Sequence, residues 1–176
     1  MQTSNTELRG MLHSQTPLLK KSFLLRAIHS EFSSREELEQ MGARFLPVQN
    51  CLYCILLVKT DLQSCDYDSL GFAAASTFNR LVEQALTDTA ETAFCCNVNE
   101  QQLAIMVYCP LCSIEEFKNY AERILSQMRA QLPANLVDSI AIAGGTIVPN
   151  MCQLPESYEK AQQAFSGGTP RIDSGI

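Results

Sequence analysis

The sequence predicts an α+β domain with a ferredoxin-like split βαβ core, in which four strands form one antiparallel sheet. The main observation is the order of the apolar patterns, which reads helix, helix, β-α-β-β-α-β, helix. A second observation is that hydrophobic residues make up 46% of the 176 residues and charged ones 18%. That is enough apolar material for a packed core without a disulfide or a metal, and it excludes wholesale disorder. The first and third strands should lie at the centre of the sheet, and two long helices should cover one face.

The first predicted elements are helical. Thr16-Pro17 starts a helix with proline in its first turn. This helix is apolar around much of its girth, through Leu18, Leu19, Phe23, Leu24, Leu25 and Ile28. It must therefore pack on more than one side: it either covers the open face of its own sheet or offers a surface to a second molecule. Residues 33–37 (SSREE) read as the capped start of a short second helix that Gly42 closes.

The core elements follow from alternating and helical periods. The predicted strands are 51–60, 93–98, 103–108 and 139–143, with the helices 69–87 and 113–132 between them and a last helix from Pro155. The second and third strands form a hairpin around the polar turn Asn99-Glu100-Gln101-Gln102. We divide the chain into a flexible or upstream helical extension (1–15), an N-terminal helical segment (16–46), the α/β domain (47–166) and a tail or linker (167–176).

Charge and targeting signals narrow the class of protein. The formal charge is −6, and an acidic surface repels phosphates, so we expect no direct contact with nucleic acid. The N-terminus lacks the basic and apolar regions of a signal peptide. The longest apolar run, around Cys51 to Val58, is far shorter than a membrane span. We expect a cytoplasmic protein that does not insert into a membrane.

The eight cysteines are expected to be reduced. Cys51 and Cys54 lie three apart in a strand and should face opposite sides of the sheet, which makes chelation of one metal difficult. Cys109 and Cys112 have redox-motif spacing, but the following helix is expected to start at Ser113, after the cysteines. A buried or incidental role is favoured over metal binding or redox chemistry.

Other candidate groups have structural explanations that we prefer. His13 and His29 belong to the N-terminal helical part and neighbour no nucleophile in a motif. A cluster of Asp61, Asp66 and Asp68 after the first strand could hold Mg²⁺, but solvation and helix capping are the favoured roles. Gly144-Gly145 lacks the spacing of a phosphate loop and indicates a turn or bulge. No nucleophile elbow, P-loop or zinc-protease motif occurs.

Three segments carry a resemblance to a known family over residues 16–166. They are the leading L-x-K-x-x-F-L helix, the S-x-E-E-L helix ending in glycine, and the final segment "SIAIAGGTIVPNMCQLPESYEKAQQAF". The chain resembles the degenerate GGDEF-like middle domain of bacterial AraC-type transcriptional regulators. Ser157, Tyr158, Ala161 and Ala164 stand where that family has its final S-Y-x-x-A-x-x-A motif.

The resemblance also implies a lost active site. An active diguanylate cyclase carries its glycines and acidic residues on the hairpin, where this chain has Asn99, Glu100, Gln101, Gln102 and Leu103. The acidic positions are glutamines, and Lys59-Thr60-Asp61 replaces the metal-binding D-x-D pair. Two-metal phosphoryl transfer needs paired carboxylates, so we expect no enzyme, no cofactor and no metal. The relic-site positions are Lys59, Asp61, Asn99, Glu100, Gln101 and Gln102.

What remains is a regulatory module. The resemblance implies a signal-relay or dimerisation domain of a transcriptional regulator whose helix-turn-helix part lies outside this chain. Its expected partners are a second copy or other domains of the parent protein. One alternative is a sensor that binds a small ligand or nucleotide in the relic cyclase pocket. A second alternative is a thiol-redox protein that uses Cys109 and Cys112.

Overall fold

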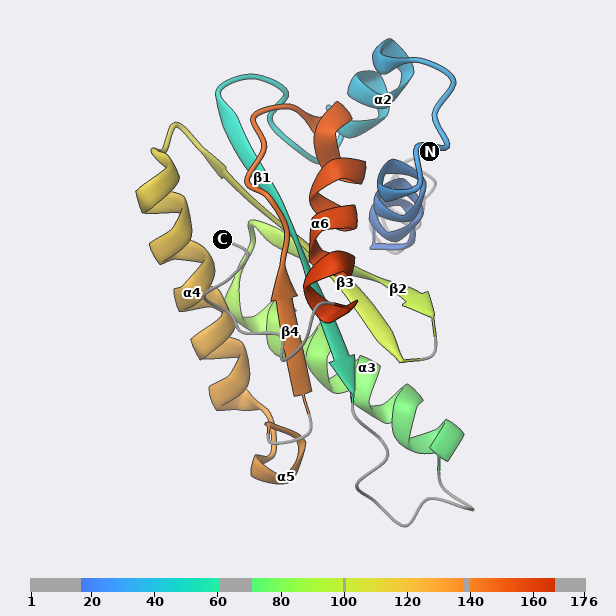
Figure 1. The fold of residues 1–176 in the computed structure, drawn as a ribbon, viewed down its shortest axis with the longest axis vertical. Helices are drawn as coiled ribbons and strands as arrows, with labels where there is room; N and C mark the ends of the chain where they lie inside the picture. The colour runs from blue at the N-terminus through green and yellow to red at the C-terminus, as the bar shows by residue number, and fades with distance from the viewer. Residues whose placement is uncertain (1–16, 61–70, 100, 138–139, 167–176) are drawn as a thin grey trace, which may run out of the picture.

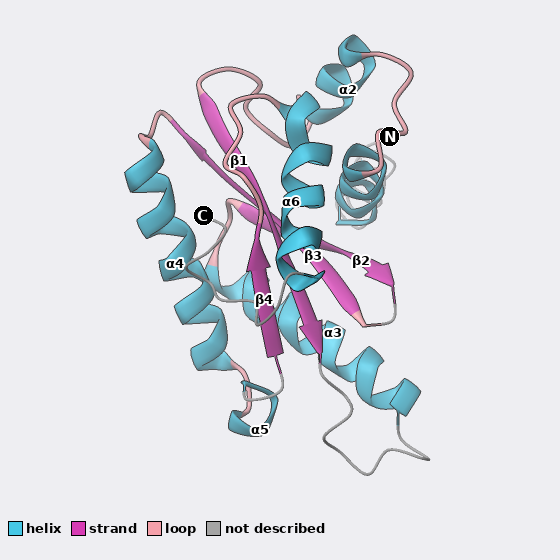
Figure 2. Ribbon diagram, in the orientation of Figure 1, coloured by secondary structure: helices cyan, strands magenta, loops and turns pink. Residues whose placement is uncertain are grey.

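The predicted four-stranded antiparallel sheet is confirmed. The computed structural model describes residues 17–60, 71–99, 101–137 and 140–166. Its strands are β1 (Cys51–Thr60), β2 (Ala93–Asn99), β3 (Gln102–Pro110) and β4 (Ile140–Gly144). They are ordered β2-β3-β1-β4 with every pairing antiparallel, so the first and third strands are central as expected (Figures 1 and 2).

Helices cover both faces of the sheet. The long helices α3 (Gly71–Thr89) and α4 (Ile114–Gln131) pack against one face, as predicted. The other face carries the helix at residues 17–28, the short α2 (Arg35–Gly42) and α6 (Leu154–Ser166), and α6 crosses in front of the strands in Figure 1. The molecule therefore has three layers and two hydrophobic cores.

Strand β1 contributes to both cores because its side chains alternate between the two faces. Cys54, Leu56 and Val58 point into the core under α3 and α4. Tyr53, Ile55 and Leu57 point into the core under α6 and the helix at residues 17–28. Each of these six side chains has a relative exposure of 0%, so β1 has no face open to water.

The structure answers part of the question about the first helix. Its inner face covers the sheet, because Phe23, Leu24, Ala27 and Ile28 are all buried in the second core. Its outer face keeps three apolar side chains in water, with relative exposures of 67% for Leu18, 44% for Leu19 and 36% for Leu25. Covering its own sheet therefore accounts for only one side of this helix.

The predicted helix caps are present. Ser34 Oγ accepts a hydrogen bond from Glu37 N at 3.1 Å at the start of α2. At the start of α4, Ser113 Oγ accepts from Glu116 N at 3.2 Å, and the Glu116 carboxylate accepts from Ser113 N at 2.7 Å. This reciprocal pair is a capping box, which satisfies two backbone N–H groups that the helix itself cannot.

Two short elements were not predicted. They are α5 (Ala134–Val137) and the 3₁₀ turn η2 (Met151–Gln153), and single turns are too short to show a hydrophobic period. The hairpin is also tighter than expected, because Asn99 pairs with Gln102 and β3 continues to Pro110. None of the helices in the described segments is both long and apolar enough to cross a membrane.

Candidate functional site

The strand register brings three relic-site positions into one row at the hairpin end of the sheet. Lys59 of β1 pairs with Gln102 of β3, and Gln102 pairs with Asn99 of β2. Directly paired residues of neighbouring strands place their side chains on the same face. Asn99, Gln102 and Lys59 therefore lie side by side; we call them the hairpin row.

The turn next to this row is held by a side chain. Asn99 Oδ1 accepts a hydrogen bond from Gln101 N at 2.9 Å, which closes a local Asx turn. The pairing of β2 with β3 is irregular between Asn97 and Asn99. Asn99 and Gln101 are exposed, and Gln102 and Lys59 are half-buried. The remaining relic-site positions, Asp61 and Glu100, lie outside the described residues.

The hairpin row carries one cation and two amides. A magnesium ion prefers carboxylate oxygens, and the Lys59 ammonium would repel it. Within the described segments, no group of three or more His, Cys, Asp or Glu residues could hold a metal ion. The aspartates Asp66 and Asp68 and the histidine His13 also lie outside the described residues, so the structure does not test the roles considered for them.

The segment that resembles the family's final motif joins α6 to the middle of β1. Ser157 has a relative exposure of 0%, and its Oγ accepts a hydrogen bond from the backbone N–H of Ile55 at 2.9 Å. Ile55 is the first residue of β1 beyond its ladder with β4, which begins at Leu56 and Gly144. The serine hydroxyl thus serves a strand N–H that would otherwise be buried without a partner.

Gly145 permits this contact. A Cβ added at Gly145 would lie 2.0 Å from the carbonyl oxygen of Ser157. The backbone continues along β1 after the glycine, because Gly145 N donates to Ile55 O and Val148 N donates to Tyr53 O, each at 2.8 Å. Gly145 therefore serves a close approach between a strand and a helix, a role that the predicted turn or bulge did not include.

The other family-motif residues also face the core. Tyr158 and Ala161 are buried in the second core, and Ala164 is half-buried. Burial raises the pKa of Tyr158, whose ring lies 5.5 Å from that of His29. His29 is exposed, and its Nδ1 lies 2.9 Å from the carbonyl oxygen of Leu25. These contacts are structural and do not form a catalytic arrangement.

The cysteine pairs lie where the sequence placed them. Cys51 faces the second core and Cys54 the first, so they point to opposite sides of the sheet as predicted. Cys109 belongs to the end of β3, and the Cys112 thiol donates to its carbonyl oxygen at 3.4 Å. Burial and the neighbouring Cys109 raise the pKa of Cys112. Helix α4 begins at Ile114, after both cysteines, so neither thiol lies at the helix N-terminus as it does in a thioredoxin-type motif.

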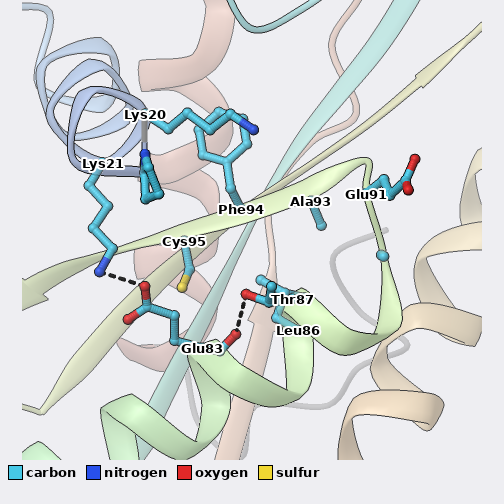
Figure 3. A pocket seen from close by; sticks show the side chains of 11 residues that line it. Lys20, Lys21, Glu83, Leu86, Thr87, Glu91, Ala93, Phe94 and Cys95 are labelled. Carbon is cyan, nitrogen blue, oxygen red and sulfur yellow. Dashed lines mark hydrogen bonds and ion pairs between the residues drawn. The ribbon is translucent and has the colours of Figure 1, made fainter. Parts of the chain in front are cut away.

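Sequence reasoning missed a groove at the lateral edge of the sheet, beside β2. We call this hollow of about 490 Å³ the β2 groove; it lies between the helix at residues 17–28 and α3 (Figure 3). Lys21 Nζ and Glu83 Oε1 form an ion pair at 2.5 Å across it. No motif marks the groove, because its lining comes from three separate segments of the chain.

Comparison with known proteins identifies the fold family. The family model of the GGDEF-like domain matches residues 26–166, which includes all four strands and the Ser157 contact. No curated protein matches the chain closely enough to be counted as a relative. Because the match covers most of the sequence, the chain belongs to the GGDEF-like domain family.

Proposed function

We propose that this chain is a non-catalytic signal-relay and dimerisation domain of an AraC-type transcriptional regulator whose DNA-binding helix-turn-helix part lies outside this sequence. In this proposal the domain acts in the cytoplasm of a bacterium, and neither DNA nor a membrane contacts it directly. The observation that carries the proposal is the hairpin row, in a domain of the GGDEF-like family.

The hairpin row argues against the cyclase reaction. Its described side chains are the amides of Asn99 and Gln102 and the ammonium of Lys59. None of these three can neutralise a divalent cation, and phosphoryl transfer relies on such cations to offset developing negative charge. Among the described residues, the hairpin row supplies no carboxylate that could hold such a cation.

The packing of the helix at residues 17–28 supports a relay role. This helix precedes the α/β core in the sequence and is tied to it on two sides. Phe23 and Leu24 are buried against the sheet, and Lys21 pairs with Glu83 of α3, which covers the opposite face. A displacement of this helix would therefore have to change contacts on both faces.

The outer face of the same helix supports self-association. Leu18 and Leu25 are seven residues apart, which places them on one side of a helix two turns apart. Both are exposed, and exposed apolar clusters mark interaction surfaces. The acidic net charge of −6 agrees with a module that leaves DNA contact to another part of the parent protein.

Two measurements on the purified chain test the proposal. With GTP and MgCl₂, chromatography of the nucleotides should show no consumption of GTP; Mg²⁺-dependent turnover would overturn the non-catalytic role. Light scattering should show a mass that rises from monomer to dimer with concentration. The double variant Leu18→Glu/Leu25→Glu should remain a monomer, whereas Leu111→Glu, at a more exposed apolar residue elsewhere, should dimerise normally. A wild-type monomer at every concentration would overturn self-association.

The hairpin row also supports a second candidate, a nucleotide sensor. Lys59 places a positive charge beside the hydrogen-bonding amides of Gln102 and Asn99, and this combination suits a phosphate or a base. Calorimetry with GTP decides this candidate: saturable binding that Asn99→Ala abolishes would support it, and absence of heat would remove it. The parent gene decides the regulator context, because downstream coding sequence should specify two helix-turn-helix motifs.

A further inference from the structure

The β2 groove has an apolar wall on each side of β2 and one cation without a carboxylate partner. Phe94 lines it on the face under the helix at residues 17–28, and Leu86 and Ala90 line it on the opposite face, beside α3; Figure 3 shows Phe94 and Leu86 on these two sides. On the other wall, Lys20 extends over the Phe94 ring, with Nζ 5.7 Å from the ring centroid. Its size lies within the range of about 300–1,000 Å³ that is usual for small-molecule sites.

The two lysines that line the groove differ in whether they form an ion pair. Lys21 is neutralised by Glu83, and none of the ion pairs between described residues involves Lys20. Lys20 is half-buried, and its Nζ lies over the Phe94 ring and not against a carboxylate. Glu91, at the rim, is exposed and well solvated. The groove therefore offers one unpaired positive charge beside an aromatic face.

The backbone of β2 adds hydrogen-bond donors. Thr92 O accepts from Tyr108 N, so Thr92 turns its backbone groups toward β3, and Phe94 does the same two residues later. In an antiparallel ladder the residues between them direct their N–H and C=O groups the other way. Because β2 is an edge strand, Ala93 and Cys95 present these groups to the groove.

From these observations we propose that the β2 groove binds a small organic anion with a planar apolar body, an aromatic carboxylate in its simplest form. The carboxylate pairs with Lys20 and accepts hydrogen bonds from the outward N–H groups of β2. The apolar body lies along the edge of β2, between Phe94 on one side and Leu86 and Ala90 on the other. This site lies on the lateral edge of the sheet and is separate from the hairpin row, so it does not depend on the relic cyclase pocket.

Binding there would have a structural consequence. The ligand would touch the helix at residues 17–28 through Lys20 and the core through Phe94 and Leu86. It would therefore stabilise the docked position of the helix that, in the proposed function, carries the signal. Whether the groove binds such a ligand does not depend on that function, because the test measures only the binding and the position of the bound ligand.

The test uses the full chain, ¹⁵N-labelled, and a panel of aromatic carboxylates led by phenylacetate. Saturable amide shifts are expected at Ala93 to Cys95 and at residues around Lys20. Acetate, which lacks the ring, and phenethylamine, which carries the opposite charge, should give none. The variant Lys20→Gln should weaken phenylacetate binding about tenfold, the usual effect of losing one hydrogen bond to a charged group. The matched variant Lys118→Gln, at an exposed lysine on α4, should bind as the wild type does.

Four results would overturn the proposal. One is the absence of shifts with every carboxylate of the panel. Another is binding that Lys20→Gln leaves unchanged. The third is a set of shifts that maps to the hairpin row or to the outer leucines of the first helix in place of the β2 groove. Phenethylamine binding at the groove would also contradict it, because that result would assign the site to Glu91.

Discussion

Replacing Ser157 with alanine should destabilise the whole domain, although it removes a single oxygen atom. In the native structure Ser157 Oγ accepts a hydrogen bond from Ile55 N at 2.9 Å, and both residues have a relative exposure of 0%. In the Ser157→Ala variant that N–H would be buried without a partner. The cost of leaving a buried polar group unpaired is about 1–3 kcal/mol.

A small opposing effect reduces this figure. Alanine is a better helix former than serine by about 0.5 kcal/mol, and Ser157 lies within α6. The net loss of unfolding free energy should therefore be about 0.5–2.5 kcal/mol. With a urea dependence of about 2 kcal/mol per molar, the unfolding midpoint should fall by about 0.3–1.3 M.

Urea unfolding followed by circular dichroism measures this shift. Ser126→Ala, at an exposed serine of α4, is the matched control and should change stability by less than about 0.5 kcal/mol. A Ser157→Ala protein as stable as the wild type would refute the reasoning. It would mean that water or another group can serve Ile55 N, and that the serine of the family motif has another role.

Three further predictions follow from other contacts. Gly145→Ala should lower the unfolding free energy by about 2–3 kcal/mol in the same assay, because its Cβ would lie 2.0 Å from Ser157 O; unchanged stability would contradict the close approach. Ser113→Ala should cost about 1 kcal/mol through loss of the capping box of α4. The backbone hydrogen bond from Ser113 lowers the pKa of Glu116 below the ordinary glutamate value of 4.5, so the contribution of Glu116 to stability is present above pH 4.5 and is lost as the pH falls through the lowered pKa. Melting temperatures measured across acidic pH should thus fall less steeply in Glu116→Gln, and parallel curves would contradict this. Burial raises the pKa values of Cys54, Cys95 and Cys96 to about 12. Iodoacetamide should therefore modify exposed Cys152 well before them, and equal labelling rates by mass spectrometry would contradict their burial. The contribution of the three buried thiols to stability should be lost as the pH rises from 9.0 toward 12.

Local signals were sufficient to predict most of the secondary structure. The run from Cys51 to Thr60 reads as a strand because branched and aromatic side chains fill both of its faces. Ser113 and Glu116 predict the start of α4, because they are close enough in sequence for each side chain to accept a hydrogen bond from the other residue's backbone N–H. The order of such elements was enough to predict the sheet, since the split βαβ arrangement permits few strand orders.

Contacts between distant segments could not be predicted in the same way. Ser157 and Ile55 are 102 residues apart, and nothing in the local sequence around either residue indicates the other. The resemblance marked Ser157 as a motif residue without showing what it contacts. The β2 groove could not be predicted for the same reason, because its lining residues Lys20, Leu86 and Phe94 belong to three different elements. The outer leucines of the first helix were seen as apolar, but only the structure separates them from the buried inner set.

Strand β1 takes part in the core contacts on which the proposed relay depends. Leu57 packs in the core that includes the helix at residues 17–28, and its neighbour Leu56 packs in the core under α3 and α4. The same strand holds α6 through the N–H of Ile55 and carries Lys59 of the hairpin row near its end. In the proposed function, a shift of the first helix changes the packing on one face of β1, and a strand with no free face can accommodate this only by changing its packing on the other. An anion in the β2 groove would oppose such a shift, because it would join Lys20 to the edge of the same sheet. The proposed relay therefore needs no catalytic site; it needs a central strand that is buried on both sides and a first helix whose docking can be strengthened or weakened.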